Sequence, residues 1–191
     1  MNKDNSINID DDIIIKNEIL KWEKDNSKKY TLNIAVLNGN LNHIKWLKNN
    51  GNLFDFITFN QAIINGNIDN MIWLKENNCP FSPETFNKAV IKGDIEIIKW
   101  LKNNGCSFNI FTFSYAAYNG NLENMKWLKS NGCEFDDNTF NQAAKIGNLE
   151  NMKWLKNNGC LFDQKNTYNW ALKNGNLENL KWLKNNGCYF N

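Results

Sequence analysis

The chain has 191 residues and a formal net charge of +2, and 42% of its residues are hydrophobic. This hydrophobic share excludes an intrinsically disordered chain, and the small net charge does not indicate a nucleic acid or an anionic membrane surface as a partner. The sequence has no run of the ~18 apolar residues that a membrane span needs, and its start lacks the basic and apolar regions of a secretion signal. We therefore expect a folded, cytoplasmic protein.

The first 30 residues predict a single helix. From Ile13 to Lys24 the pattern is helical, with apolar Ile19 and Trp22, and three aspartates stand before it. We expect residues 1–30 to form a degenerate capping half-repeat, because a terminal repeat has one face in water. The polar residues at its start are expected to be frayed.

From residue 31 onward one pattern recurs six times. Tryptophans follow one another at intervals of 27, 27, 27, 27 and 28 residues, at Trp46, Trp73, Trp100, Trp127, Trp154 and Trp182. A threonine stands fifteen residues before each, at Thr31, Thr58, Thr85, Thr112, Thr139 and Thr167. All eleven glycines fall seven residues before or five residues after these tryptophans. This regularity identifies a repeat protein, with predicted repeats at residues 31–57, 58–84, 85–111, 112–138, 139–166 and 167–191.

Each repeat predicts two short helices, and the fifth repeat carries the clearest signals. Thr139 is expected to cap the first helix, and Gly147 is expected to end it in the left-handed conformation. Asn148 is expected to cap the second helix, whose apolar residues, including Trp154, occupy more than one side. A helix buried on two sides fits a stack in which each repeat covers the next.

The fifth repeat resembles an ankyrin repeat. Its second half, from Gly147 to Cys160, reads G-N-L-E-N-M-K-W-L-K-N-N-G-C, and its first half is similar to the P-L-H-x-A-A segment of that family. The resemblance covers residues 31–191 and implies an all-α solenoid of stacked helix-turn-helix repeats. Because these repeats have 27 residues where ankyrin repeats have ~33, we expect shortened finger loops.

The Asn- and Lys-rich variant is similar to ankyrin-like proteins of AT-rich giant DNA viruses. The 40 asparagines and the absence of arginine would follow from AT-rich codons, so we attach no functional weight to them. The resemblance implies a non-enzymatic scaffold for protein–protein interaction. For a viral chain it further implies host–virus interaction in the host cytosol.

The sequence predicts no catalytic, cofactor or metal site. Five cysteines recur six residues after a tryptophan, at Cys79, Cys106, Cys133, Cys160 and Cys188. They form none of the close pairs typical of zinc sites, and stacked helices hold them too far apart for disulfides, so we expect buried, reduced thiols. His43 is the only histidine, and we expect it on the solvated surface. No base stands beside a nucleophile, and no carboxylates pair across a pocket.

Two rows of lysines on the second helices support an alternative function, the binding of nucleic acid or another polyanion. They flank the tryptophans at Lys45, Lys99, Lys126, Lys153 and Lys181, and at Lys48, Lys75, Lys102, Lys129, Lys156 and Lys184. Carboxylates run beside these rows, as in the pair Glu150 and Lys153, and no arginine is present to recognise bases. A solvated face is the favoured interpretation, so we do not expect nucleic acid as the partner.

Positions that vary between copies of a fixed scaffold are candidates for binding a partner protein. On the first helices these are the third and sixth residues after the threonine, which share one helix face. We call them the variable stripe: Ile34, Gln61, Lys88, Tyr115, Gln142, Trp170, Leu37, Ile64, Ile91, Tyr118, Lys145 and Lys173. Tyr and Trp are favoured binding anchors, and in ankyrin-like folds this face is the concave, binding one. The alternative, that the stripe only packs the first helices together, stays open. The linkers also vary, and the most distinctive are residues 55–57, 82–84 and 109–111.

The last repeat keeps an apolar surface where a terminal repeat should turn polar. Leu172, Leu180, Trp182 and Phe190 are among its apolar residues. We therefore expect weak self-association through this repeat, or a partner that docks at residues 167–191.

Overall fold

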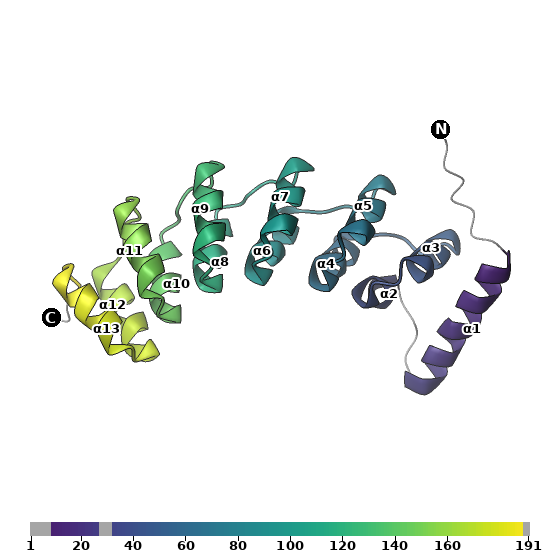
Figure 1. The fold of residues 1–191 in the computed structure, drawn as a ribbon, viewed down its shortest axis with the longest axis horizontal. Coiled ribbons are helices and arrows are strands. Elements are labelled where there is room, and N and C mark those ends of the chain that lie inside the picture. The colour runs from purple at the N-terminus through teal and green to yellow at the C-terminus, as the bar shows by residue number, and fades with distance from the viewer. Residues whose placement is uncertain (1–8, 27–31, 189–191) are drawn as a thin grey trace. The chain divides into compact units, whose positions relative to one another are not determined.

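In this computed structural model, which describes residues 9–26 and 32–188, the chain divides into two compact units, residues 1–85 and 86–191. Every regular element in these ranges is an α-helix, as predicted (Figure 1). The first unit contains α1 (Ile9–Asn26), α2 (Leu32–Asn38), α3 (Leu41–Asn49), α4 (Phe56–Asn65) and α5 (Ile68–Glu76). The second contains α7 (Ile95–Asn103), α8 (Thr112–Asn119), α9 (Leu122–Ser130), α10 (Thr139–Ile146), α11 (Leu149–Asn157), α12 (Gln164–Asn174) and α13 (Leu177–Asn185). The boundary between the units falls inside α6 (Pro83–Lys92).

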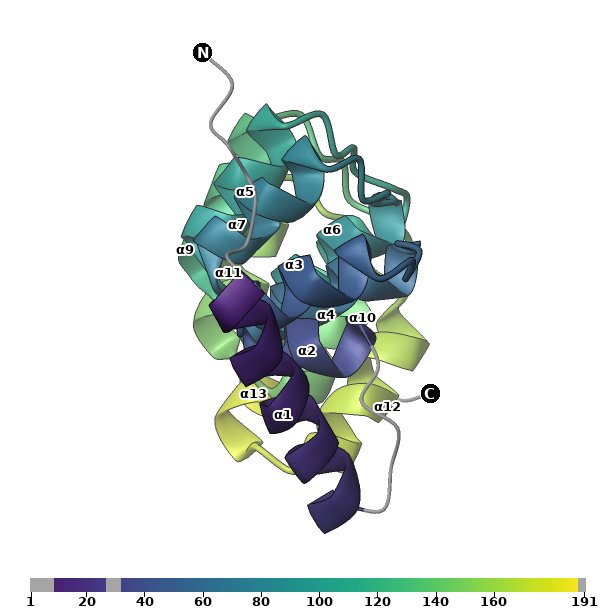
Figure 2. The ribbon, with the colours of Figure 1, turned by 90° about the vertical axis from the view of Figure 1, so that its right-hand side faces the viewer.

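Within the second unit the helices form two layers. The first helix α10 packs between the first helices α8 and α12, and each of these three packs against the second helix that follows it in the chain. Figure 2 shows the second helices α7, α9 and α11 together on one side and the first helices α6 and α10 on the other. These are stacked helix-turn-helix repeats, the all-α fold class expected from the sequence.

The signals at the turn between paired helices act as predicted. Gly147 ends α10 with φ 80°, and its backbone N–H donates to the carbonyl of Ala143 at 3.0 Å. Glycine adopts this left-handed conformation at a lower conformational energy than residues with a Cβ. One residue later the Asn148 side chain accepts from the backbone N–H of Asn151 at 3.1 Å and caps α11. The chain therefore reverses in two residues.

The prediction for the threonines was wrong. Asn138 holds the N-cap position of α10, and Thr139 is the first residue inside the helix, fully buried. Its hydroxyl accepts from the backbone N–H of Asp136 at 3.1 Å. Threonines at this position also reach the preceding repeat, since the Thr112 hydroxyl donates to the side-chain oxygen of Asn87 at 2.7 Å. The threonine thus closes the loop before its helix and joins two repeats.

The core lies between the two layers. The first helices α6, α8 and α10 each bury a phenylalanine, α8 and α10 also bury an alanine pair, and the second helices α7, α9 and α11 each bury a methionine or isoleucine with a leucine: Phe86, Phe113, Phe140, Ala116, Ala117, Ala143, Ala144, Ile98, Met125, Met152, Leu101, Leu128 and Leu155. Fully burying one such large side chain contributes about 1.5–3 kcal/mol. The tryptophans are only half-buried. Trp154 stacks on Phe113 of the preceding repeat with ring centroids 6.4 Å apart, so it does pack between layers while keeping one edge exposed.

Many of the asparagines, to which we attached no functional weight in the sequence, form hydrogen bonds that stabilise the fold. Asn124, Asn151 and Asn179 are fully buried on the second helices. The Asn124 amide donates to the carbonyl of Gly93 at 2.9 Å, and the Asn151 amide donates to that of Gly120 at 2.7 Å. Each bond joins a second helix to the glycine turn of the preceding repeat and satisfies the carbonyl of a half-buried glycine. We call these bonds the asparagine clamps.

His43 corrects a prediction in the first unit. It occupies the position of the clamping asparagines and is buried, with 8% of its surface exposed, where the sequence indicated a solvated residue. Its Nε2 lies 2.9 Å from Glu18 Oε2, on α1, which packs against α3. Helix α1 extends beyond the predicted range of Ile13 to Lys24 at both ends. Its residues Ile15 and Ile19 are buried.

Several sequence predictions fall outside the described residues. They concern the frayed start, Thr31 and Phe190. The six predicted repeat boundaries remain our proposal for the organisation of the chain.

Candidate functional site

None of the residues of the variable stripe is fully buried. Eight are exposed, namely Leu37, Ile64, Lys88, Ile91, Tyr115, Tyr118, Lys145 and Lys173, and four are half-buried, namely Ile34, Gln61, Gln142 and Trp170. In each unit the stripe therefore presents side-chain surface to solvent. Five apolar or aromatic members have between 37% and 51% of their surface exposed: Leu37, Ile64, Ile91, Tyr115 and Tyr118.

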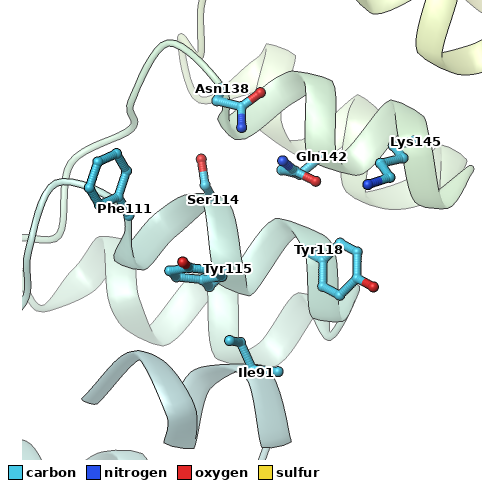
Figure 3. Close-up of a pocket in the computed structure, with 8 residues that line it drawn as sticks. All are labelled: Ile91, Phe111, Ser114, Tyr115, Tyr118, Asn138, Gln142 and Lys145. Atoms are coloured by element: carbon cyan, nitrogen blue, oxygen red, sulfur yellow. The ribbon is translucent and has the colours of Figure 1, made fainter. Parts of the chain in front are cut away.

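A groove of about 340 Å³ brings five stripe residues of the second unit together. They come from three neighbouring first helices: Ile91 from α6, Tyr115 and Tyr118 from α8, and Gln142 and Lys145 from α10. Figure 3 shows the two tyrosines on α8 facing the glutamine and the lysine on α10. Tyr115 is 37% exposed and Tyr118 43% exposed, so both rings are accessible. The groove can therefore take an apolar side chain against aromatic walls.

Lysine and aromatic side chains alternate beyond one end of the groove. Lys145 Nζ lies 5.6 Å from the ring centroid of Tyr118 and 5.1 Å from that of Trp170. Lys173 Nζ lies 4.5 Å from the same Trp170 ring. These distances are those of cation–π contacts, which hold an ammonium group over a ring face. Two positive charges are thus held beside exposed aromatic surface.

The other end of the groove is organised by a carboxylate. The Ser114 hydroxyl, which lines the groove, donates to Asp136 Oδ1. The same oxygen accepts from the backbone N–H of Asn138 at 2.9 Å and from the Thr139 hydroxyl at 2.9 Å. Asp136 Oδ2 is buried and has no hydrogen-bond partner within the part of the chain that the structure describes. Asp136 thus lies in the loop behind the Ser114 and Asn138 end of the groove, while Lys145 lines the groove on the side of Tyr118 and Gln142.

Three lining residues were not among the predicted site residues. Phe111 precedes α8 and is 54% exposed, while Ser114 and Asn138 line the carboxylate end. Phe111 belongs to a linker that the sequence marked as distinctive. Ser114 could have been found, because it is the one residue at its repeat position that is not asparagine. Asn138 carries no signal of its own in the sequence.

All five cysteines are buried free thiols, as expected for small apolar core residues. Burial raises the pKa of the Cys133 thiol from 9.0 to about 12, and the nearby carboxylates of Glu134 and Asp136 act in the same direction. Burial likewise raises the pKa of Cys79 and Cys160 to about 12. Because the thiolate is the reactive form, these cysteines are poor nucleophiles in the folded chain.

The lysine rows of the second helices contact aromatic rings. Lys48 lies 4.1 Å from the ring centroid of Phe54, and Lys102 lies 3.9 Å from that of Phe108. Lys99 pairs with Glu96 at 3.0 Å, the i,i+3 arrangement that the sequence indicated for this face. These three ammonium groups thus have partners within their own helices and loops.

Within residues 9–26 and 32–188, no three His, Cys, Asp or Glu side chains gather as metal ligands. In the same ranges no helix is both long enough and apolar enough to cross a membrane.

Comparison with known proteins identifies the repeat. A family model for ankyrin repeats in three copies matches residues 113–191, the segment that runs from α8 to beyond α13. No curated protein matches the chain. Ankyrin repeats generally mediate protein–protein interaction and are typically not enzymes. Residues 113–191 are therefore ankyrin repeats.

Proposed function

We propose that the chain is a non-enzymatic scaffold that binds a partner protein through the variable stripe of its first helices. The observation that carries this proposal is the groove of the second unit, where Tyr115 and Tyr118 expose aromatic surface beside Gln142 and Lys145. Tyrosine supplies a large contact area at a small cost in side-chain entropy. Polar groups around such an anchor fix the orientation of the bound chain.

The proposed setting is a reducing cytoplasm. The five buried free thiols support it, because a cytoplasmic chain keeps its cysteines reduced. Weak self-association is a further proposal for the C-terminal helix pair α12 and α13. It is supported by Leu177, which is 72% exposed although the corresponding Leu149 is half-buried.

Comparative capture of partners tests the binding proposal. The intact chain, the Tyr115→Ser/Tyr118→Ser variant and a matched control are each immobilised and exposed to the same protein mixture. Leu161→Ser is the control, because Leu161 is an apolar side chain that is 86% exposed and lies outside the stripe. We expect the intact chain and the control to capture the same proteins and the tyrosine variant to lose them. An identical set on all three would refute the proposal.

The same experiment includes a folding check. Both tyrosines are exposed, so their replacement should leave the helix content and the urea midpoint nearly unchanged. A tyrosine variant that unfolds at a much lower urea concentration would show that the stripe is a packing element.

A further inference from the structure

The first helices of the second unit carry charge of one sign. From Phe86 onward, α6, α8, α10 and α12 contain five lysines and no carboxylate, the lysines being Lys88, Lys92, Lys145, Lys165 and Lys173. The acidic residues of this unit lie on the second helices, as Glu96, Glu123, Glu150 and Glu178, and in the loops. Because the first helices of this unit carry no carboxylate from Phe86 onward, the stripe face has a positive charge that these helices do not neutralise themselves.

The aromatic rings fix two of these charges in place. Lys145 lies between Tyr118 and Trp170, and Lys173 lies over Trp170, at the distances given above. A lysine held over a ring loses less side-chain entropy when it pairs with an anion than a freely moving one. These two ammonium groups are therefore positioned to receive carboxylates from a partner that already contacts the groove.

The size and the polar lining of the groove fit part of a polypeptide. A volume of about 340 Å³ lies at the lower limit of small-molecule sites, and it holds one or two side chains. Gln142 and Asn138 bring side-chain amides to its wall, and an amide can both donate to and accept from a peptide backbone. A bound segment can thus place an apolar side chain between the tyrosines while its backbone meets these amides.

The carboxylate at the other end distinguishes a peptide from a nucleic acid. Asp136 is bonded to Ser114 and Asn138, and Asp137 stands exposed beside it. A nucleic acid carries a phosphate at every nucleotide, so a strand that continued past Asn138 would bring phosphates towards these two carboxylates. A peptide can carry its acidic residues at one end only, beside Lys145 and Lys173.

We propose that this groove binds an acidic segment of the partner protein. An apolar or aromatic side chain of the segment packs against Tyr115 and Tyr118, and the carboxylates that accompany it pair with Lys145 and Lys173. This proposal rests on the proposed function and specifies the chemistry of its partner.

Selection from a library tests it. Random peptides of about twelve residues are displayed and selected on the intact chain, and the enriched peptides are synthesised and titrated by fluorescence polarisation. We expect enriched peptides to combine Asp or Glu with an aromatic or aliphatic residue. Replacing their Asp and Glu with Asn and Gln should weaken binding about five-fold for each contacting carboxylate.

Matched lysine variants locate the charges. Lys145→Gln/Lys173→Gln should weaken binding of the acidic peptides by roughly 10- to 25-fold. Lys126→Gln/Lys153→Gln removes two exposed lysines from the second helices α9 and α11 and should change the affinity by less than about two-fold. Helix content by circular dichroism confirms that both variants fold.

The possible results separate the two proposals. If peptides without carboxylates are enriched and bind in a manner that depends on Tyr115 and Tyr118, the acidic partner is wrong and the proposed function stands. If no enriched peptide depends on these tyrosines, the proposed function fails. An oligothymidine of about 20 nucleotides could instead compete as strongly as the acidic peptides and fail to bind the Lys145→Gln/Lys173→Gln variant. In that case the groove is a nucleic-acid site, and the proposal of an acidic segment is refuted.

Discussion

Removal of one asparagine clamp tests how the repeats are held together. Asn124 is fully buried, and its amide is 2.9 Å from the carbonyl of Gly93, at the turn between α6 and α7. In Asn124→Ala this hydrogen bond is lost, which costs about 1 kcal/mol, and the carbonyl of half-buried Gly93 loses a donor, which costs about 1–3 kcal/mol where no water replaces it. Part of the loss is offset, because Asn124 Oδ1 is itself buried without a partner among the described residues. We expect the free energy of unfolding to fall by about 2 kcal/mol.

A second clamp gives the matched comparison. The carbonyl of Gly120 accepts from Asn151 at 2.7 Å and also from Asn148 at 3.3 Å. In Asn151→Ala this carbonyl keeps one donor, so the loss should be about 1 kcal/mol smaller than in Asn124→Ala. Asn131→Ala is the control, because its amide caps α9 at an exposed site, bonded to the Trp127 carbonyl at 2.8 Å.

Urea unfolding followed by circular dichroism measures all three variants. Their order should be Asn124→Ala, then Asn151→Ala, then Asn131→Ala, from the largest loss to the smallest. An Asn124→Ala midpoint equal to that of the intact chain would refute the clamp as a stabilising bond, and a larger loss in Asn151→Ala would refute the role of the second donor.

Three further predictions concern the glycine turns, the thiols and the C-terminal helix pair. Gly147 and Gly159 both have φ of 80°, but a Cβ on Gly147 would collide with the Asn174 amide, while a Cβ on Gly159 would meet open space. In urea unfolding, Gly159→Ala should therefore lower the free energy of unfolding by about 1–2 kcal/mol, and Gly147→Ala should lower it clearly more. Equal losses would show that Asn174 moves aside freely. The pKa of Cys133 is raised from 9.0 to about 12 in the folded chain, so above pH 9 the folded chain keeps a proton that the unfolded chain releases. The stability that this thiol contributes is complete below pH 9 and should fall as the pH rises from about 9 towards 12. Urea midpoints measured over this pH range should fall less in Cys133→Ala than in the intact chain, and an equal fall in both would contradict this pKa. Sedimentation over a wide range of concentrations should show association of the intact chain and a monomeric Leu177→Lys variant, since Leu177 is 72% exposed; an intact chain that stays monomeric would refute the proposed self-association.

The fold could be predicted because its signals are local. The spacing of Gly147 and Asn148 fixes where one helix ends and the next begins, and both act as the sequence indicated. The bonds that join repeats could not be predicted in the same way. Asn124 and Gly93 are 31 residues apart, and His43 and Glu18 are 25 apart. A polar residue on a short helix resembles a surface residue until the neighbouring repeat covers it.

The candidate site was predicted in part, for a physical reason. Tyr115, Tyr118 and Lys145 vary between repeats and stand on one helix face, so their positions marked them directly. Ser114 and Asn138 line the same groove, but they act through Asp136, which lies in the loop before α10. Whether a loop carboxylate meets a helix of the preceding repeat depends on stacking, and repeat spacing alone does not contain this information.

Ser114 changes the hydrogen bonds between repeats at one end of the groove. At the other copies of this position an asparagine stands, and Asn87 and Asn141 accept from the threonine hydroxyl of the following repeat at 2.7 Å. Serine is shorter, and Thr139 bonds instead to Asp136, which also accepts from Ser114. The Ser114 hydroxyl thus pairs with a loop carboxylate and not with the threonine of the next repeat. One departure from the repeat pattern changes the hydrogen bonds at this end of the groove, while the buried residues and the asparagine clamps maintain the stack.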